Sequence, residues 1–321
     1  MGKFRVVVTD DRYGSYEEEN RVLSELGIEV EVHNLDPVSP DISVLKDADA
    51  LLANLFPVTE KIILSMDRCR IISRYGVGYD SVDVEAAARK GIWVANVPDY
   101  SIEDVSDHAL ALILGCVRKI VFKDRMIRDG HWNLHRIQPS FRIRGSKLGL
   151  IGFGAIAKAL MRKVSGLGLS AVLVHDPYVD PEDISSLGGT PASLEYLLEN
   201  SDYVSIHVPL TDETAGMIGK EQFAMMKKDS ILINTSRGPV VDGKALHEAL
   251  DTGSISAAGI DVFEKEPLPG DSPLKKLDNI ILSDHTGWYS EESIVELKTK
   301  AALNVLSVLK GEAPPYPVNH V

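Results

Sequence analysis

The sequence predicts an α/β protein in which two lobes are each built on a parallel β-sheet. The chain has 321 residues, and at about 150 residues per domain this length suggests two domains. Short apolar runs alternate with segments of helical periodicity, which is typical of parallel strands buried on both faces. A second series of this kind begins near residue 147, after a long helical segment.

The first series predicts a lobe that ends near residue 98. Between its first two strands, Glu17–Leu26 carries apolar residues at helical spacing. The expected strands are Phe4–Val8, Ile28–Val32, Ala50–Ala53, Ile71–Ser73 and Ile92–Val94.

One long helix is then expected, beginning after Ser101 and ending near Arg128. Ser101 is a good N-cap, and Glu103 stands in the first turn, where the helix dipole favours an acid. Gly130 gives a stop signal beyond the last turn. A helix of this length is typical of a connection between lobes.

The second series predicts a larger sheet. Helices are expected over Ala155–Leu167 and, after the N-cap Ser290, from Glu291 to about residue 310. The expected strands are Lys147–Ile151, Ala171–His175, Tyr203–His207, Ser230–Asn234, Ala257–Ile260 and Asn279–Leu282.

Composition excludes several classes of function. There are 34 basic and 47 acidic residues, a net charge of −13, which argues against nucleic acid or an anionic membrane as the main partner. No apolar run approaches the roughly 18 residues of a membrane helix, and we expect no secretory signal at the start. Two cysteines form neither a disulfide framework nor a four-thiolate zinc site. A cytoplasmic location is therefore expected.

A glycine-rich turn follows the first strand of the second series. It reads Gly152-x-Gly154-x-x-Ala157 and opens a helix, which is the pattern that brings a backbone turn and a helix N-terminus to a pyrophosphate. The next strand ends in Asp176, about twenty residues on, where an acid binds the adenosine ribose and repels a 2′-phosphate. This pattern predicts NAD rather than NADP. The alternative is that Asp176 merely caps the turn before Pro177.

Three polar residues follow three later strands of this series, namely Arg237, Glu266 and His285. The carboxyl ends of parallel strands are where open α/β sheets bind ligands. An Arg forks onto a carboxylate, a His exchanges a hydroxyl proton, and a Glu stabilises the protonated His. The set therefore predicts oxidation of a 2-hydroxy acid. Glu264 is the alternative to Glu266, and a surface role is the alternative for Arg237.

In these segments the sequence resembles the D-isomer-specific 2-hydroxyacid dehydrogenases, a family that includes phosphoglycerate dehydrogenases, glyoxylate/hydroxypyruvate reductases and the C-terminal-binding-protein-like branch. The resemblance covers nearly the whole chain. The matching segments, in this order, are RYGVGYDSVD, NVPDYSIEDVSDHAL, GFGAIAKAL, HDP, HVPLTDETAGMIG, INTSRGPVVD, GIDVFEKEP and DHTGWYS.

The resemblance implies two Rossmann-like parallel-sheet lobes. A flavodoxin-like substrate domain is expected from residues 1–98 and 291–321, and an NAD-binding Rossmann domain from residues 99–290. A homodimer assembled through the NAD-binding domain is also implied, with the long helix contributing.

The resemblance further implies residue roles. Arg237, Glu266 and His285 fall on the catalytic positions. The implied cofactor-binding residues are Gly152, Gly154, Ala155, Ile156, Asp176, His207, Val208, Pro209, Thr235, Ser236, Arg237, Asp261, His285 and Gly287. The implied substrate-binding residues are Val77, Gly78, Arg237, His285 and Trp288.

Two departures from the family pattern bear on the reaction. Asp284 stands where the family has Pro before the catalytic His, and we expect its carboxylate to point to solvent. The first-lobe loop LLANLFPVT has no Arg or Lys before Lys61, which disfavours a phosphorylated substrate. D-3-phosphoglycerate dehydrogenase-type activity remains an alternative. An NAD(H)-sensing, corepressor-like binding protein is a second one, suggested by the segment around Trp288.

The other histidines considered are not expected to be catalytic. His108 is expected to be structural, and His207 could be a strand-end residue. His131 and His135 are four residues apart, but they follow the helix stop and lack a third ligand, so no metal site is predicted.

Overall fold

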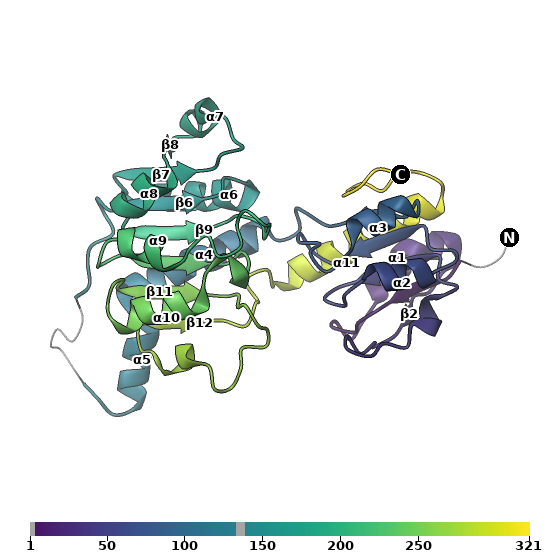
Figure 1. Cartoon of the computed structure of the whole chain (residues 1–321), viewed down its shortest axis with the longest axis horizontal. Coiled ribbons are helices and arrows are strands. Elements are labelled where there is room, and N and C mark those ends of the chain that lie inside the picture. Colours follow the sequence, from purple (N-terminus) through teal and green to yellow (C-terminus); the bar gives the residue numbers. More distant parts are fainter. Residues whose placement is uncertain (1–3, 133–138) are drawn as a thin grey trace. The chain divides into compact units, whose positions relative to one another are not determined.

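The computed structural model describes residues 4–132 and 139–321. The chain divides into two compact units, one formed by Met1–Ser101 with Ser290–Val321 and the other by Ile102–Tyr289. Each unit contains its own parallel sheet (Figure 1). The predicted α/β class with two parallel-sheet lobes is confirmed.

The first unit holds a five-stranded sheet in the order β2-β1-β3-β4-β5. All of its pairings are parallel. This order is the flavodoxin-like one, in which ligands bind beyond the carboxyl ends of the strands. The strands are β1 (Val6–Val8), β2 (Glu31–Val32), β3 (Ala50–Ala53), β4 (Ile71–Arg74) and β5 (Trp93–Ala95).

The helices of the first unit come from both ends of the chain. Ser290 caps the last of them by accepting a hydrogen bond from Ser293 N at 3.0 Å, and Ser73 Oγ on β4 donates to Ala301 O of that helix at 3.0 Å. The C-terminal helix is thereby attached to the N-terminal sheet. The helices are α1 (Glu17–Leu23), α2 (Glu60–Ser65), α3 (Val84–Arg89) and α11 (Glu291–Leu309), with 3₁₀ turns η1 (Ser24–Leu26) and η2 (Ile42–Leu45).

The second unit holds a seven-stranded parallel sheet in the order β12-β11-β10-β9-β6-β7-β8. This is the doubly wound dinucleotide-binding order with one strand added at an edge, and its order reverses between β6 and β9. The edge strand β8 was not predicted, because its two residues are exposed. The strands are β6 (Lys147–Ile151), β7 (Ala171–His175), β8 (Thr190–Pro191), β9 (Tyr203–Ile206), β10 (Ile231–Asn234), β11 (Ala257–Ile260) and β12 (Ile280–Leu282).

The single long helix expected after Ser101 is two helices, so that prediction was wrong. The helix is interrupted at Lys119, which adopts a left-handed conformation with φ of 54°. The N–H of Lys119 donates to Cys116 O at 3.1 Å. The helices of this unit are α4 (Ile102–Arg118), α5 (Ile120–Arg128), α6 (Ala155–Val164), α7 (Pro181–Ser186), α8 (Leu194–Asn200), α9 (Lys220–Met225) and α10 (Gly243–Asp251), with η3 (Ser165–Leu167), η4 (Gly238–Val240) and η5 (Pro273–Lys276).

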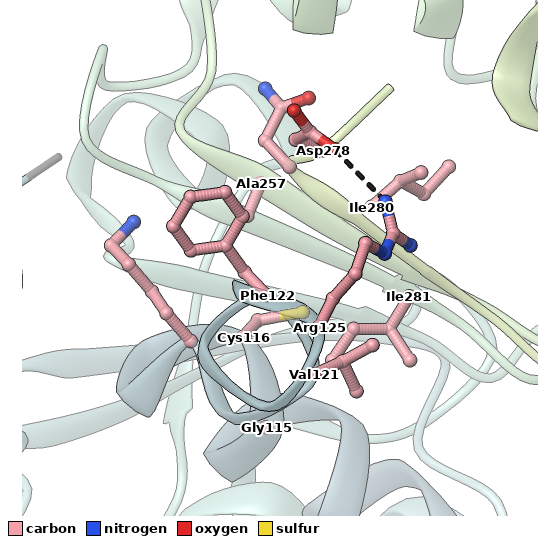
Figure 2. Close-up of a pocket in the computed structure, with 11 residues that line it drawn as sticks. Gly115, Cys116, Val121, Phe122, Arg125, Ala257, Asp278, Ile280 and Ile281 are labelled. Atoms are coloured by element: carbon pink, nitrogen blue, oxygen red, sulfur yellow. Dashed lines mark hydrogen bonds and ion pairs between the residues drawn. The ribbon is translucent and has the colours of Figure 1, made fainter. Parts of the chain in front are cut away.

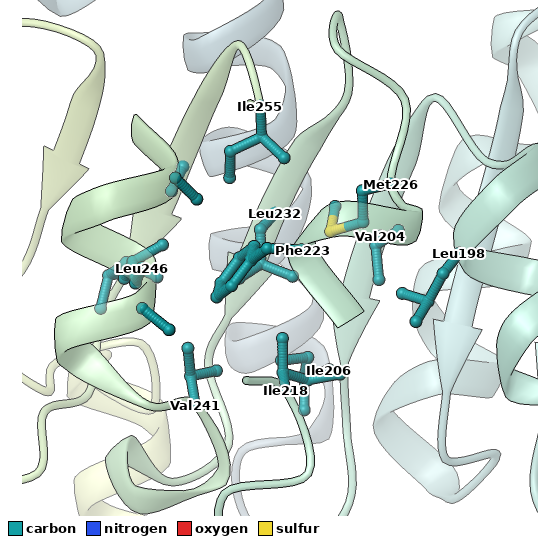
Figure 3. Close-up of a cluster of buried hydrophobic side chains, with 14 of the residues drawn as sticks. Leu198, Val204, Ile206, Ile218, Phe223, Met226, Leu232, Val241, Leu246 and Ile255 are labelled. Carbon is teal, nitrogen blue, oxygen red and sulfur yellow. The ribbon is translucent and has the colours of Figure 1, made fainter. Parts of the chain in front are cut away.

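Both faces of the seven-stranded sheet are buried. One face packs against α8, α9 and α10, where Leu198, Phe223 and Leu246 meet strand residues such as Ile206 and Leu232 (Figure 3). The other face packs against α4 and α6. The strand ends at the carboxyl edge are therefore held in place from both sides. Within the described residues, no helix combines the length and the apolarity that crossing a membrane requires.

Candidate active site

The turn after β6 has the geometry of a phosphate-binding turn. Gly152 has φ of +87°, and a Cβ there would lie 2.9 Å from both the backbone carbon and the oxygen of His207. Gly154 is the N-cap of α6 and makes no side-chain cap, and a Cβ on it would meet no atom within 4 Å. Ala157 is fully buried, as the close packing of helix and strand requires. No side chain caps the N-terminus of α6, which leaves its first N–H groups to a ligand and fits a pyrophosphate.

Asp176, which directly follows β7, is hydrogen-bonded to this turn. Its Oδ2 accepts a hydrogen bond from Phe153 N at 2.8 Å, and its Oδ1 accepts one from Tyr178 N at 3.0 Å. Each carboxylate oxygen keeps further lone-pair capacity for a ribose hydroxyl. The turn and the acid therefore form one arrangement that fits a dinucleotide.

His207 directly follows β9, beside the same turn. Its N–H donates to Ile151 O at 2.7 Å, and its Nε2 lies 2.9 Å from Ser205 Oγ. Burial lowers the pKa of His207 to about 4, so the ring is neutral at pH 7. Val208 and Pro209 follow, and Thr214 Oγ1 donates to Pro209 O at 2.6 Å.

The turn after β10 carries Thr235, Ser236 and Arg237. Asn234, which is 1% exposed, organises it, since its Oδ1 accepts from both the N–H and the Oγ of Ser236 at 3.0 Å and its Nδ2 donates to Arg237 O at 3.0 Å. Sequence reasoning missed Asn234, although an amide directly before a polar turn is a signal for such a role. Arg237 Nη1 donates to Ser236 O at 2.8 Å.

Glu266 and His285 form a pair. His285 Nδ1 lies 2.6 Å from Glu266 Oε2, and Glu266 Oε1 accepts from Phe263 N at 2.9 Å. Burial alone would raise the pKa of Glu266, but the hydrogen bonds from His285 and Phe263 and the charge of Arg237 outweigh it and lower the pKa. The alternative acid, Glu264, accepts instead from Gly243 N at 3.0 Å.

The ionised Glu266 carboxylate fixes which ring nitrogen of His285 carries a hydrogen. A carboxylate only accepts hydrogen bonds, so Nδ1 of His285 must donate. Nε2 is then the nitrogen that exchanges a proton with a ligand.

The backbone of His285 is held in an uncommon conformation. Its φ is 58°, in the left-handed region that costs a non-glycine residue roughly 1–2 kcal/mol. Its N–H donates to Asp261 O at 2.8 Å, and its carbonyl accepts from Trp288 Nε1 at 2.9 Å. Trp288 therefore holds the His285 backbone directly. The sequence predicted a substrate-binding role for Trp288 and did not predict this hydrogen bond.

Two aspartates near this histidine differ in burial: Asp261 is buried and Asp284 is exposed. Asp261 is 2% exposed, and its two carboxylate oxygens accept from Thr286 N at 3.1 Å and Gly287 N at 3.0 Å. Asp284 is exposed and accepts from Thr286 Oγ1 at 2.8 Å, which agrees with a carboxylate directed to solvent.

The loop after β4, in the first unit, holds the residues Val77 and Gly78 that the sequence predicts to bind substrate. Gly76 has φ of +125°, a backbone conformation that residues with a side chain rarely adopt, so the turn favours glycine. Asn96 Nδ2 donates to Val77 O at 2.7 Å, and Val97 N donates to Gly76 O at 3.0 Å. Within the described part of the chain, the N–H groups of Val77 and Gly78 have no hydrogen-bond acceptor, which suits them to bind an anion.

The described residues contain no group of three or more His, Cys, Asp or Glu side chains that could hold a metal ion. His131 is exposed, and His135, the other member of the pair considered from the sequence, lies outside the described residues.

Comparison with known proteins identifies the class. Residues 110–287 match the family model described as the NAD-binding domain of D-isomer specific 2-hydroxyacid dehydrogenases. A glyoxylate reductase from Korarchaeum cryptofilum is 41% identical over 87% of this chain and 85% of its own length. A D-3-phosphoglycerate dehydrogenase from Methanocaldococcus jannaschii is 37% identical over 98% of this chain, which spans only 59% of that protein.

A solved structure of a related dehydrogenase has the same fold. The D-lactate dehydrogenase from Aquifex aeolicus, in complex with NAD and lactic acid, superposes with a TM-score of 0.89 at 28% identity, covering 99% of this chain and 100% of that one. The fold and the glycine turn thus define an NAD-dependent oxidoreductase. More specifically, the chain belongs to the D-isomer specific 2-hydroxyacid dehydrogenase family and is an NAD-dependent 2-hydroxyacid dehydrogenase. The predicted family and cofactor are confirmed.

Proposed function

We propose that the chain interconverts a small, unphosphorylated D-2-hydroxy acid and its 2-keto acid, with Arg237, Glu266 and His285 as its catalytic residues. Residues 1–98 and 291–321 form the substrate domain in this proposal, and residues 99–290 form the NAD-binding domain. The observation that carries it is the 2.6 Å contact between His285 Nδ1 and Glu266 Oε2. This pair lies at the same sheet edge as the glycine turn, because every strand pairing in this unit is parallel.

The residues divide the work of the reaction. NADH, when bound, supplies the hydride to carbon 2 of the keto acid. His285 gives the proton from Nε2 to the developing hydroxyl oxygen, and in the oxidative direction it takes that proton back. Glu266 stabilises the charged imidazole and fixes its orientation.

Arg237 is the cation assigned to the substrate carboxylate and the reacting oxygen. Its planar guanidinium presents paired donors that match a carboxylate. The substrate-binding roles that the family resemblance implies for the N–H groups of Val77 and Gly78 are kept in this proposal. A chain with a net charge of −13 depends on such local donors to bind an anionic acid.

The loop after β3 supports an unphosphorylated substrate. Leu55 is 46% exposed, whereas Phe56 is buried. The loop is held by the carboxylate of Asp10, which accepts from Asn54 N at 2.9 Å and Leu55 N at 2.8 Å. No Arg or Lys stands in this loop before Lys61, so it offers no cation for a phosphate and suits a short or apolar side chain.

A substrate screen tests the proposal. NADH oxidation is followed with glyoxylate, hydroxypyruvate, pyruvate, branched and aromatic 2-keto acids, and 3-phosphohydroxypyruvate. We expect turnover with one or more unphosphorylated acids and a much lower kcat/KM for the phosphorylated one. A preference for 3-phosphohydroxypyruvate would support the phosphoglycerate dehydrogenase alternative. Absence of turnover with every acid, while NADH binds, would support the corepressor-like alternative.

A homodimer and a cytoplasmic location are also part of this proposal. Helix α5 has no buried residue, and it exposes Ile120, Val121 and Ile127 at 59%, 42% and 52%. Clustered exposed apolar side chains of this kind mark a protein interface, and we assign this one to a second copy of the chain. The two cysteines are buried free thiols, as in a reducing compartment.

A pocket adjoins α5. It lies between the α4–α5 junction and strands β11 and β12, and Phe122 and Ile280 line it (Figure 2). Arg125 Nη1 pairs with Asp278 Oδ1, another residue that lines the pocket, at 2.9 Å.

Light scattering tests the proposed dimer, with an expected mass of twice the 35.1 kDa of one chain. A mass of one chain at micromolar concentration would refute it.

A further inference from the structure

His108 contacts both ends of the loop Ser283–Gly287, which carries His285. At the start of the loop, His108 Nε2 lies 2.9 Å from Ser283 Oγ. At its end, the His108 ring lies against Gly287, where an added Cβ would be 3.2 Å from His108 Cδ2. All of these residues belong to the same compact unit. One side chain of α4 therefore fixes the loop on both sides of the histidine.

The direction of the hydrogen bond between His108 and Ser283 follows from its neighbours. Ser283 Oγ donates its single hydrogen to Asp261 Oδ1 at 2.6 Å, because a carboxylate only accepts. The hydroxyl must then accept from His108, so Nε2 of His108 carries a hydrogen. That Nε2 is also 3.5 Å from Asp261 Oδ1. The His108 hydrogen thus goes to Ser283 Oγ, and the Ser283 hydrogen goes to the Asp261 carboxylate.

Asp261 connects His108 and Ser283 to the backbone around His285. Its carboxylate binds the N–H groups of Thr286 and Gly287, and its main-chain oxygen binds His285 N at 2.8 Å. Left-handed conformations of residues other than glycine persist where the surrounding contacts enforce them. A Cβ on Gly287 would also approach Asp261 Oδ2 to 2.9 Å, so the loop is confined between Asp261 and His108.

We propose that His108 is a positioning residue for His285, acting through Ser283 and Asp261 on the loop that holds the catalytic ring. The inference rests on the proposed acid–base role of His285. If the side chain at position 108 served only for packing, an apolar side chain could replace it. We propose instead that the site requires the hydrogen bond that His108 donates from Nε2.

Two substitutions of His108 separate packing from hydrogen bonding. His108→Leu removes the donor, and we expect kcat to fall on the order of 10- to 100-fold through displacement of the catalytic ring. The KM for NADH stays within about twofold, because the dinucleotide turn is untouched. His108→Gln keeps a donor near the place of Nε2 and recovers most of kcat. Asp107→Asn is the matched control on α4, since Asp107 pairs with Lys163 at 2.7 Å, and it leaves kcat unchanged.

Ser283→Ala gives an independent test through a double-mutant cycle. The losses in kcat for His108→Leu and Ser283→Ala are expected to be non-additive, because both variants break the same chain of hydrogen bonds. Circular dichroism and NADH fluorescence titration verify that each variant is folded and binds NADH. A wild-type kcat in His108→Leu would overturn the proposal, as would equal losses in the Leu and Gln variants or additive losses in the cycle.

His285→Gln measured alongside separates the two proposals. An inactive His285→Gln with a fully active His108→Leu would overturn the positioning role alone. A fully active His285→Gln would overturn the proposed function itself.

Discussion

Nδ1 of His285 lies 2.6 Å from Oε2 of Glu266, and the carboxylate accepts its hydrogen. This contact selects the ring nitrogen that reacts, because it occupies Nδ1 and leaves Nε2 for the substrate. It also explains why the lowered pKa of Glu266 matters, since only the ionised carboxylate supports a charged imidazole at neutral pH.

Glu266→Gln tests this pairing. The amide oxygen still accepts from Nδ1, but the negative charge is lost, so the protonated imidazole is less stable. We expect kcat for keto-acid reduction to fall at least about tenfold, and the loss of activity with rising pH to begin at a lower pH. The measurement is a pH profile of kcat. Glu264→Gln is the matched control and leaves the profile unchanged, because Glu264 caps Gly243 instead; equal profiles for Glu266→Gln and the wild type would contradict the pairing.

Arg237→Ala tests the carboxylate-binding role. Removing charge-assisted hydrogen bonds, worth about 1.5–3 kcal/mol each, is expected to lower kcat/KM for the keto acid about 100-fold or more. The Kd for NADH should change little. Arg237→Lys keeps the charge but not the fork, and it should recover only part of the activity. A loss of NADH affinity equal to the loss in kcat/KM would contradict this role.

Asp176→Asn tests cofactor selectivity. The wild type is expected to prefer NADH over NADPH, because Asp176 binds ribose hydroxyls and repels a 2′-phosphate. Its neutral amide analogue should reduce the ratio of the two kcat/KM values about 10- to 100-fold. Steady-state kinetics with both cofactors measures this ratio. A wild-type preference for NADPH would refute the assignment of Asp176.

His207 predicts a loss of stability in acid. Its folded-state pKa is about 4, below the ordinary 6.5, so the unfolded chain binds the extra proton first as the pH falls. Stability therefore decreases between about pH 6.5 and pH 4, by at most about 3 kcal/mol at about 1.36 kcal/mol per pH unit. Denaturant midpoints of the wild type and His207→Gln at pH 7 and pH 4.5 measure this, and the variant should lose less. His131→Gln, at an exposed histidine, is the control; an equal acid loss in all three proteins would contradict the account.

Much of this fold follows from local pattern. Strands such as Lys147–Ile151 and Ala257–Ile260 are buried apolar runs with the bounds predicted for them. The break at Lys119 was not predictable, because apolar residues continue at helical spacing through it.

The site shows the same division between pattern and packing. The sequence indicated Arg237, Glu266 and His285 by their places after strands, and the structure brings Glu266 and His285 into contact. The support that Asp261 and Trp288 give to the His285 backbone could not be inferred, because it depends on a left-handed residue. Asn234 could have been found from its place before a polar turn.

The most direct measurement is the pH dependence of NADH-linked keto-acid reduction by the wild type and by His285→Gln. With His285 as the proton donor, the kcat profile of the wild type has a limb on which activity falls as the pH rises. The variant should lose about 10²- to 10⁴-fold in kcat and that limb of the profile, with NADH binding retained. A His285→Gln enzyme that keeps the wild-type rate and pH profile would contradict the central claim.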